Sequence, residues 1–384
     1  MRDEKTEHPA AREEKAERPA KREEKAEHPA KREEKNEYPA ALAEQLLAWY
    51  DAGHRELPWR TEPTPYRVWI SEIMLQQTRV EAVKPYFARF MDALPDVESL
   101  ANVENERLMK LWEGLGYYSR ARHLKAAAEQ IVQAFAGIIP SSREDLLRLP
   151  GIGSYTAGAI SAFAYNKREP AVDGNVLRVL ARLSADDRDV LDPRTKTAVE
   201  EELRPLIPAD RPGDFGQAMI EIGAVVCQPK SPRCGECPLA GLCRAHALGA
   251  ESSYPVRIKK TPHRTEERTV LVVVSDRSLA ICRRPDSGLL AGLWELPNVG
   301  RYMTPDEATA FVREKMGLEP LRIEELPPAK HVFTHITWEM RGYRIRVADP
   351  EPGTTAEPFV FADRETLSRR YAIPTAFSAF LKAL

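Results

Sequence analysis

Apolar residues recur at three- and four-residue spacing through the first two thirds of the chain, after a polar start. This spacing places them on one face of a helix, and proline or glycine separates one segment from the next. The pattern predicts helices at residues 42–50, 66–91, 104–115, 120–136, 143–150 and 155–165. We therefore predict an all-α region over residues 41–246.

The pattern changes after residues 247–265, which are polar, contain proline and are interpreted as a linker. Residues 268–284 then indicate two strands around a turn, residues 304–317 have helical spacing, and residues 331–348 indicate a pair of strands. Residues 266–384 are therefore predicted to be a separate α+β domain.

The first forty residues differ from the rest, since they repeat a ten-residue unit that ends in Pro-Ala. The proline of each unit interrupts any helix, and the units have almost nothing to bury. We predict a solvated, disordered tail over residues 1–40. The repeat does not indicate which partner it binds.

Composition narrows the possible functions only slightly. The chain has 384 residues, enough for two or three domains, and a formal net charge of -2, so any nucleic-acid binding depends on local motifs. It contains no apolar run of about eighteen residues and no apolar N-terminal signal segment. We therefore expect a cytoplasmic protein without membrane association.

Four of the five cysteines cluster in CQPKSPRCGECPLAGLC, as Cys227, Cys234, Cys237 and Cys243. Thiolates this close favour a four-sulfur metal site in a reducing compartment over disulfides, and tetrahedral zinc is an alternative to an iron–sulfur cluster. The six-two-five spacing resembles the cluster loop of the endonuclease III family of DNA repair enzymes, which implies one 4Fe–4S cluster. Cys282 lies in an apolar segment and is expected in the core.

A second motif, LPGIGSYTAGAIS at residues 149–161, places two glycines between apolar helical stretches. Gly151 and Gly153 would let the backbone approach a phosphate at a helix N-terminus, although a short helix–helix turn also needs glycine for steric reasons alone. Further along, Asp173 stands beside Gly174, just before a helical segment. Hairpin, loop and aspartate together resemble the helix–hairpin–helix glycosylase superfamily.

Glu72 is the second carboxylate of interest, because apolar residues dominate both sides of it in VWISEIMLQQ. It is either an acid in a pocket or part of an exposed helix face with Arg79 as its partner. Cleavage of a glycosidic bond needs an acid for the leaving group and a carboxylate that stabilises the cationic sugar. Glu72 and Asp173 are the available pair.

Four segments, SEIMLQQTRV, GLGYYSRAR, LPGIGSYTAGAI and VDGNVLRVLAR, resemble the MutY family of adenine DNA glycosylases and occur in its order. The resemblance covers residues 41–384 and implies a multidomain fold class. An all-α helix–hairpin–helix glycosylase domain would carry the iron–sulfur cluster loop, followed by an α+β Nudix-like C-terminal domain. The first domain would consist of a six-helix module at about residues 63–166 and a cluster module from residues 41–62 and 167–246.

The resemblance also implies a reaction and a partner. The partner is double-stranded DNA in which adenine is mispaired with 8-oxoguanine or guanine, and the adenine is flipped out before its N-glycosidic bond is hydrolysed in base excision repair. Glu72 would protonate adenine at N7, Asp173 would stabilise or capture the oxocarbenium ion, and Asn175 would position these groups. From the residues alone, Asn175 could equally cap the helix that follows.

Further residues are implied to meet the DNA around the flipped base. Gln77 and Tyr117 would wedge into the base stack, with Thr78 and Leu115 near the oxidised base. An aromatic residue at a Gly-Leu-Gly turn, as Tyr117 is, otherwise serves as a packing residue.

The C-terminal domain resembles the Nudix-type domain that this family uses to inspect 8-oxoguanine. A working Nudix motif ends in Arg-Glu-x-x-Glu-Glu-x-Gly, and aligning its last position on Gly317 leaves one carboxylate, Glu314, so nucleotide hydrolysis is not expected. The recognition loop, usually Phe-Ser-His, reads Phe333, Thr334 and His335 here, and threonine keeps the hydroxyl. An ordinary turn between strands is the alternative interpretation.

The residues leave two other functions open: a bifunctional glycosylase/lyase acting on oxidised pyrimidines, and a non-catalytic DNA-binding module with a redox cluster. The lyase needs a lysine that forms a Schiff base. In the lyase branch of the superfamily that lysine follows the Gly-x-Gly turn, where this chain has Tyr155, and the nearest lysine in sequence is Lys167. We therefore expect a monofunctional, monomeric glycosylase in a bacterial cytoplasm, associated with the nucleoid through DNA.

Overall fold

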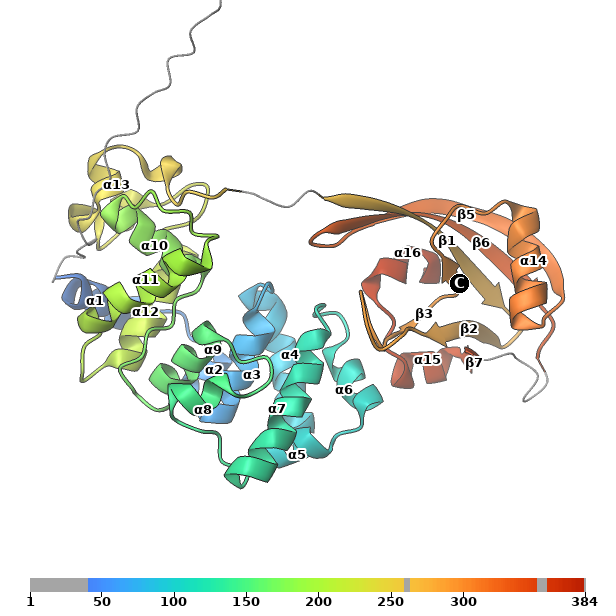
Figure 1. The fold of residues 1–384 in the computed structure, drawn as a ribbon, viewed down its shortest axis with the longest axis horizontal. Helices are drawn as coiled ribbons and strands as arrows, with labels where there is room; N and C mark the ends of the chain where they lie inside the picture. Colours follow the sequence, from blue (N-terminus) through green and yellow to red (C-terminus); the bar gives the residue numbers. More distant parts are fainter. Residues whose placement is uncertain (1–40, 259–262, 351–357, 383–384) are drawn as a thin grey trace, which may run out of the picture. The chain divides into compact units, whose positions relative to one another are not determined.

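The computed structural model of the chain describes residues 41–258, 263–350 and 358–382 (Figure 1). The tail predicted to be disordered, at residues 1–40, lies outside the described residues, as do residues 259–262 of the predicted linker. Within the described ranges, no helix has both the length and the apolar character needed to cross a membrane.

The first described range is helical, as the apolar spacing predicted (Figure 1). Its α-helices are α1 (Leu42–Gly53), α2 (Pro58–Thr61), α3 (Pro65–Leu75), α4 (Val80–Ala93), α5 (Val97–Asn102), α6 (Asn105–Trp112), α7 (Ser119–Phe135), α8 (Arg143–Leu147), α9 (Ser154–Ala159), α10 (Gly174–Ser184), α11 (Pro193–Leu203), α12 (Pro212–Val225) and α13 (Arg244–Ala247). The π-helix η1 (Ile160–Ala164) continues α9. The short 3-10 helices of this range are η2 (Arg204–Leu206), η3 (Cys234–Glu236), η4 (Ala240–Leu242) and η5 (Glu251–Ser253).

The single helix predicted at residues 66–91 is wrong, because the structure has two helices, α3 and α4, separated at residues 76–79. Gln77 has a φ of 62°, in the left-handed region that an α-helix excludes. The carbonyl oxygens that end α3 accept hydrogen bonds from the guanidinium of Arg120 instead of from further helix amides. Arg120 lies 44 residues beyond Gln76, so local apolar spacing does not reveal this partner.

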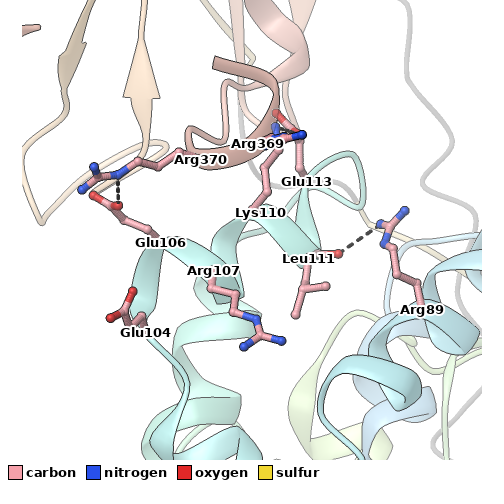
Figure 2. Close-up of a pocket in the computed structure, with 9 residues that line it drawn as sticks. All are labelled: Arg89, Glu104, Glu106, Arg107, Lys110, Leu111, Glu113, Arg369 and Arg370. Atoms are coloured by element: carbon pink, nitrogen blue, oxygen red, sulfur yellow. Dashed lines mark hydrogen bonds and ion pairs between the residues drawn. The ribbon is translucent and has the colours of Figure 1, made fainter. Parts of the chain in front are cut away.

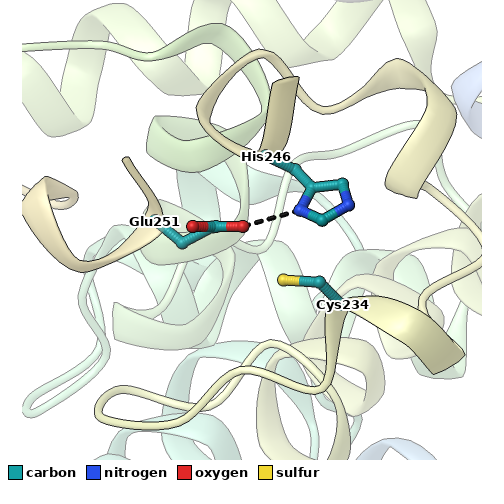
Figure 3. A group of neighbouring side chains, drawn as sticks. All are labelled: Cys234, His246 and Glu251. Atoms are coloured by element: carbon teal, nitrogen blue, oxygen red, sulfur yellow. Dashed lines mark hydrogen bonds and ion pairs between the residues drawn. The ribbon is translucent and has the colours of Figure 1, made fainter. Parts of the chain in front are cut away.

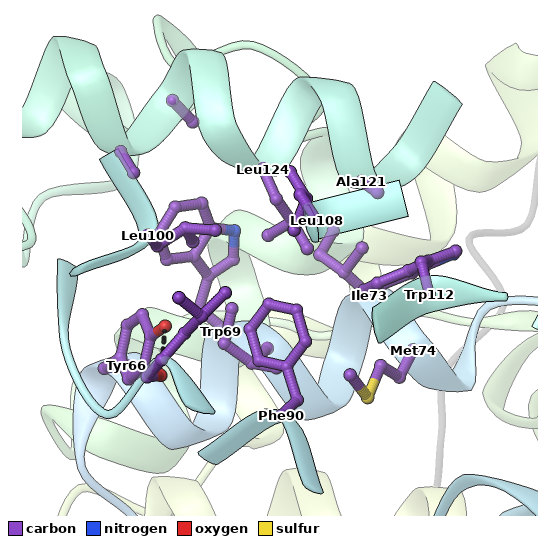
Figure 4. Close-up of a cluster of buried hydrophobic side chains, with 14 of the residues drawn as sticks. Tyr66, Trp69, Ile73, Met74, Phe90, Leu100, Leu108, Trp112, Ala121 and Leu124 are labelled. Carbon is purple, nitrogen blue, oxygen red and sulfur yellow. Dashed lines mark hydrogen bonds between the residues drawn. The ribbon is translucent and has the colours of Figure 1, made fainter. Parts of the chain in front are cut away.

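Two hydrophobic cores anchor these helices. In one core, Trp69 of α3, Phe90 of α4 and Trp112 of α6 are fully buried, and the last two rings meet edge to face with centroids 6.0 Å apart (Figure 4). The other core joins α1 to α10 through fully buried side chains that include Leu46 and Leu180. Burying one such side chain contributes roughly 1.5–3 kcal/mol. The helices next to both candidate carboxylates are therefore firmly anchored.

The remaining described residues form the predicted α+β domain around one seven-stranded sheet. Its strands are β1 (Arg264–Val274), β2 (Ser278–Arg283), β3 (Trp294–Glu295), β4 (Asn298–Val299), β5 (Pro320–Val332), β6 (Ile336–Val347) and β7 (Phe359–Asp363). Its helices are α14 (Pro305–Met316), α15 (Arg364–Arg370), the 3-10 helix η6 (Thr375–Phe377) and α16 (Ser378–Leu381). The strand order is β3-β2-β1-β6-β5, with β4 beside β1 and β7 beside β2.

Strand β1 lies at the centre of this sheet, parallel to β6 and antiparallel to β2. Its side chains alternate between two cores, so Val270 packs with Trp338 on one face and Leu271 packs with Val312 of α14 on the other. Burial on both faces explains the continuous apolar run VLVVV. The strand pair predicted at residues 331–348 is confirmed only in part. β5 and β6 do pair antiparallel up to Val332, which lies opposite Thr337, but all of β5 except its last two residues precedes the predicted segment.

Candidate active site and cysteine loop

Glu72 lies within α3, a helix whose first turn is capped by the side chain of Thr64. Glu72 is only 7% exposed, and the hydroxyl of Tyr155 donates a hydrogen bond to its Oε2 at 2.5 Å. Tyr155 is the second residue of α9, directly after the glycine hairpin. The alternative interpretation, an exposed helix face with Arg79 as partner, is therefore wrong.

The surroundings of Glu72 favour its protonated form. Burial, above all, raises the pKa of Glu72 to about 7, and the nearby charge of Asp173 acts in the same direction. The hydrogen bond from Tyr155 and the charge of Arg60 oppose this rise. A carboxyl group with a pKa near neutrality can act as a general acid at physiological pH.

Asp173 is the N-cap residue of α10. Its Oδ1 accepts hydrogen bonds from the backbone amides of Asn175 and Val176, both at 2.8 Å, and its Oδ2 accepts one from Asn175 Nδ2 at 2.7 Å. Burial raises the pKa of Asp173, while these three donors stabilise its charged form. Asn175 is not the helix cap, so that alternative is wrong, and its amide contacts the carboxylate directly.

The glycine hairpin between α8 and α9 needs its two glycines for different reasons. Gly151 has a φ of 75°, and a Cβ there would stand 2.6 Å from the Cβ of His123. Gly153, the N-cap of α9, has ordinary backbone angles, and a Cβ there would meet nothing within 4 Å. The steric interpretation therefore explains Gly151 but not Gly153, where the open space agrees with the predicted approach of a phosphate.

Two loops carry the residues expected to contact the base stack. Gln77 follows α3, and Tyr117, which has a φ of 46°, precedes α7. Tyr117 is 48% exposed and therefore not a buried packing residue, whereas Leu115 is buried. The amide of Thr78 bonds to the carbonyl of Leu75 and closes the turn after α3.

The loop between β5 and β6 carries the predicted recognition residues. The amide of Phe333 donates to the carbonyl of Ile336 at 2.8 Å, and the Phe333 ring meets Trp338 edge to face. Gln77 and Tyr117 line a cavity of about 590 Å³ together with Phe333, Thr334 and His335. The Tyr117 hydroxyl lies 2.7 Å from Thr334 Oγ1.

The four clustered cysteines follow α12 and alternate with short helices. None of them forms a disulfide. Burial raises the pKa of the Cys234, Cys237 and Cys243 thiols, and the charges of other cysteines in the loop contribute. Their thiolates would therefore repel one another, and a bound cationic centre would relieve that repulsion. This all-sulfur donor set fits an iron–sulfur cluster.

Two further side chains approach this loop. The ligand atoms of Cys234, His246 and Glu251 lie within 4.8 Å of one another (Figure 3). His246 Nδ1 and Glu251 Oε1 are 2.6 Å apart. A carboxylate and an imidazole therefore lie directly beside one thiol of the cluster loop.

A second cavity, of about 610 Å³, is lined mainly by charged side chains (Figure 2). Arg370 pairs with Glu106 there at 2.7 Å, and Arg89 donates to the carbonyl of Leu111. Neither candidate carboxylate lines this cavity. We therefore do not assign the reaction to it.

Several arginines that support the site were not predicted from the sequence. Arg178 donates to Asn175 Oδ1 and to the carbonyl of Cys227, each at 2.8 Å, and so links the active site to the cysteine loop. Arg182 donates to Cys227 Sγ at 3.3 Å. The signal was present in VLRVLARL, since arginines inside an apolar helical run are either paired or functional.

Three segments of the chain match known protein families. Residues 70–209 match the HhH-GPD superfamily of base excision DNA repair proteins. Residues 227–243 match the iron–sulfur binding domain of endonuclease III, and residues 269–383 match the NUDIX domain. These matches confirm the predicted superfamily, cluster loop and C-terminal domain.

Individual proteins give the same assignment. Adenine DNA glycosylase of Mus musculus is 35% identical over 381 residues, which cover 83% of this chain and 73% of the mouse protein. The Homo sapiens adenine DNA glycosylase is 34% identical over 383 residues, which cover 83% of this chain and 69% of the human protein. The structure of a thermostable thymine-DNA glycosylase matches 54% of this chain and 96% of its own, with a TM-score of 0.50 and 26% identity. The chain therefore belongs to the adenine DNA glycosylase family, whose members are enzymes of base excision repair in the HhH-GPD superfamily.

Proposed function

We propose that this chain hydrolyses the N-glycosidic bond of adenine mispaired with 8-oxoguanine or guanine in duplex DNA, and leaves the strand uncut. The observation that carries the proposal is the pair of buried carboxyl groups, Glu72 and Asp173, in one site but with different surroundings. A pKa of about 7 keeps a large fraction of Glu72 protonated at neutral pH, whereas Asp173 is surrounded by three donors that favour its charged form. Such a pair divides into an acid and a charge stabiliser.

The reaction then follows from these two groups. Glu72 donates its proton to N7 of the flipped adenine, which leaves as a neutral base when the bond to C1′ breaks. Asp173 stabilises the oxocarbenium ion or captures it transiently. Water then adds at C1′, displacing Asp173 where it has bonded, and its proton passes to the Glu72 carboxylate, which restores the acid. Asn175 holds the Asp173 carboxylate through its side-chain amide, and Arg178 holds Asn175.

The absence of strand cleavage rests on the residue after the hairpin. Tyr155 offers a phenol in place of an amine, and burial keeps the pKa of Tyr155 well above its usual range. The ammonium group of Lys167 donates to Ser141 Oγ at 2.8 Å, in an exposed position. Neither group is suited to form a Schiff base with the sugar.

In this proposal, the base opposite adenine binds in the cavity that is lined by Gln77, Tyr117 and the β5–β6 loop. Gln77 and Tyr117 wedge into the base stack and offset the few kcal/mol that base extrusion costs. Thr78 and Leu115 lie near the oxidised base. Phe333, Thr334 and His335 inspect it, and Gly151 and Gly153 bring the hairpin backbone to a phosphate.

We further propose that Cys227, Cys234, Cys237 and Cys243 hold one 4Fe–4S cluster. When bound, the cluster anchors the irregular loop between α12 and α13. The free cysteines support a reducing compartment, and we place the enzyme in a bacterial cytoplasm, as a monomer on nucleoid DNA.

Single-turnover base release from A:8-oxoG, A:G and T:G duplexes tests the proposal, with wild type and Glu72→Gln compared. We expect adenine release from the first two substrates only, intact strands until alkali is added, and at least a 100-fold loss in the variant. Adenine release that survives the substitution would show that Glu72 is not the acid. Preferred release from T:G, or strand cleavage without alkali, would contradict the substrate or the monofunctional reaction.

A further inference from the structure

The two loops that carry Gln77 and Tyr117 hold both residues in a costly conformation. Their φ angles of 62° and 46° lie in the left-handed region, which is unfavourable for a residue other than glycine. Such a conformation persists only when surrounding contacts hold it.

A single side chain bonds to both of them. Arg120 Nη1 donates to the carbonyls of Ile73, Met74 and Gln76, at 2.5, 3.1 and 2.7 Å. Its Nη2 donates to the carbonyls of Leu115 and Gly116, at 3.1 and 3.2 Å. One planar group thus bridges the end of α3, directly before Gln77, and the loop directly before Tyr117.

Arg120 is only 8% exposed, and its guanidinium makes no ion pair in the described structure; backbone carbonyls and two aromatic rings surround it. The carbonyl end of α3 is the negative end of a helix dipole and has no helical partners of its own. The rings of Trp112 and Tyr117 lie 5.4 and 5.5 Å from the guanidinium carbon. Burial lowers the pKa of Arg120 to about 10, so it remains charged at neutral pH.

We propose that Arg120 is a positioning residue that sets the spacing between Gln77 and Tyr117 and thereby the discrimination between 8-oxoguanine and guanine opposite adenine. This inference rests on the proposed function. The two wedge residues belong to different loops, so neither loop alone determines their separation. The active-site carboxyl Glu72 accepts no bond from Arg120 and is bound by Tyr155 instead.

Arg120→Lys tests this role, because lysine keeps the charge but has no planar fork that spans both loops. We expect the ratio of single-turnover rates on A:8-oxoG and A:G to fall at least 10-fold, with the pH midpoint of the reaction unchanged. Tyr66→Phe is the matched control, since it removes a buried bond to the carbonyl of Leu94 in the same core. Its ratio should equal that of wild type.

Equal losses on both substrates in Arg120→Lys, or the same change of ratio in Tyr66→Phe, would overturn the proposal. Native-state hydrogen exchange of the wild type is the second measurement, and it does not depend on whether the variant folds. Amides at residues 76–79 and 114–118 should open with the same free energy, because one group holds both loops. Different opening free energies for the two loops would overturn the proposed role of Arg120, whatever the substrate preference of the wild type. If the wild type failed to prefer A:8-oxoG, that result would refute the proposed function and not the link between the loops.

Discussion

Glu72 shows what a residue's sequence context can and cannot predict. Its apolar neighbours in VWISEIML left both a pocket and an exposed helix face open, and the structure shows that Glu72 is buried. Its hydrogen bond to Tyr155 joins residues 83 positions apart, so no local pattern could reveal it. The structure links Glu72, Asp173 and Asn175, the residues predicted to carry the reaction, with Tyr155 through hydrogen bonds or charge. The arginines around them were found only in the structure.

Glu72→Gln should increase stability more at pH 8 than at pH 5. The unfolded chain releases this proton near pH 4.5, whereas the folded chain holds it up to about pH 7. The stability that protonated Glu72 contributes is therefore complete below pH 4.5 and is lost as pH rises towards 7, by up to about 3 kcal/mol. Urea unfolding at both pH values measures the difference. Glu81→Gln, at an exposed position, should show none.

Tyr155→Phe should move the alkaline limit of adenine release to higher pH. The Tyr155 hydroxyl bonds to Glu72 and lowers the pKa of that carboxyl, so its removal lets the pKa rise above about 7. Single-turnover rates measured between pH 6 and 9 would record the shift. Tyr165→Phe serves as control, because that hydroxyl bonds to the carbonyl of Ile139 instead. An unchanged limit in Tyr155→Phe would contradict the assigned coupling.

At the scale of elements, spacing predicted the long helices better than the strands, since only β1, β2 and β6 lie where strands were predicted. It did not predict where a helix is interrupted. The segment LQQTRV contains no glycine or proline, so nothing local indicated the break between α3 and α4. The break depends on Arg120, which comes from another helix. The hairpin between α8 and α9 was predictable, because its glycines indicated a turn. One of them, Gly151, is sterically required there.

Gly151→Ala should destabilise the chain, whereas Gly153→Ala should leave stability almost unchanged. Alanine at residue 151 would adopt a left-handed φ, at a cost of about 1–2 kcal/mol, and would overlap the Cβ of His123, which cannot rotate away. At residue 153 the methyl group would enter open space. Urea unfolding of the two variants makes the comparison. Equal losses would mean that the hairpin is not constrained in this way.

At the scale of the whole molecule, the change from helical spacing to short strand-like segments correctly predicted the fold class, because helices and strands place apolar residues at different spacings. What holds the irregular cysteine loop was not predictable. Arg182 binds segments that lie 45 to 72 residues away: its Nη1 contacts Cys227 Sγ and the Gln228 carbonyl, and its Nε contacts the carbonyls of Glu251 and Tyr254. A buried arginine in a helical segment indicates that its charge has a partner, but the sequence does not identify that partner.

Arg182→Lys should therefore lower the iron and sulfide content of the purified protein to less than half of the wild-type value. Lysine keeps the charge but cannot bind the cysteine loop and the segment after α13 at the same time, so the thiols lose their common arrangement. Arg188→Lys is the matched control, because Arg188 pairs with Asp186 and Glu202 and not with the loop. Iron analysis and thermal unfolding of both variants distinguish a local from a general effect. Full iron content in Arg182→Lys, or an equal loss in Arg188→Lys, would show that the cysteine loop does not depend on this arginine.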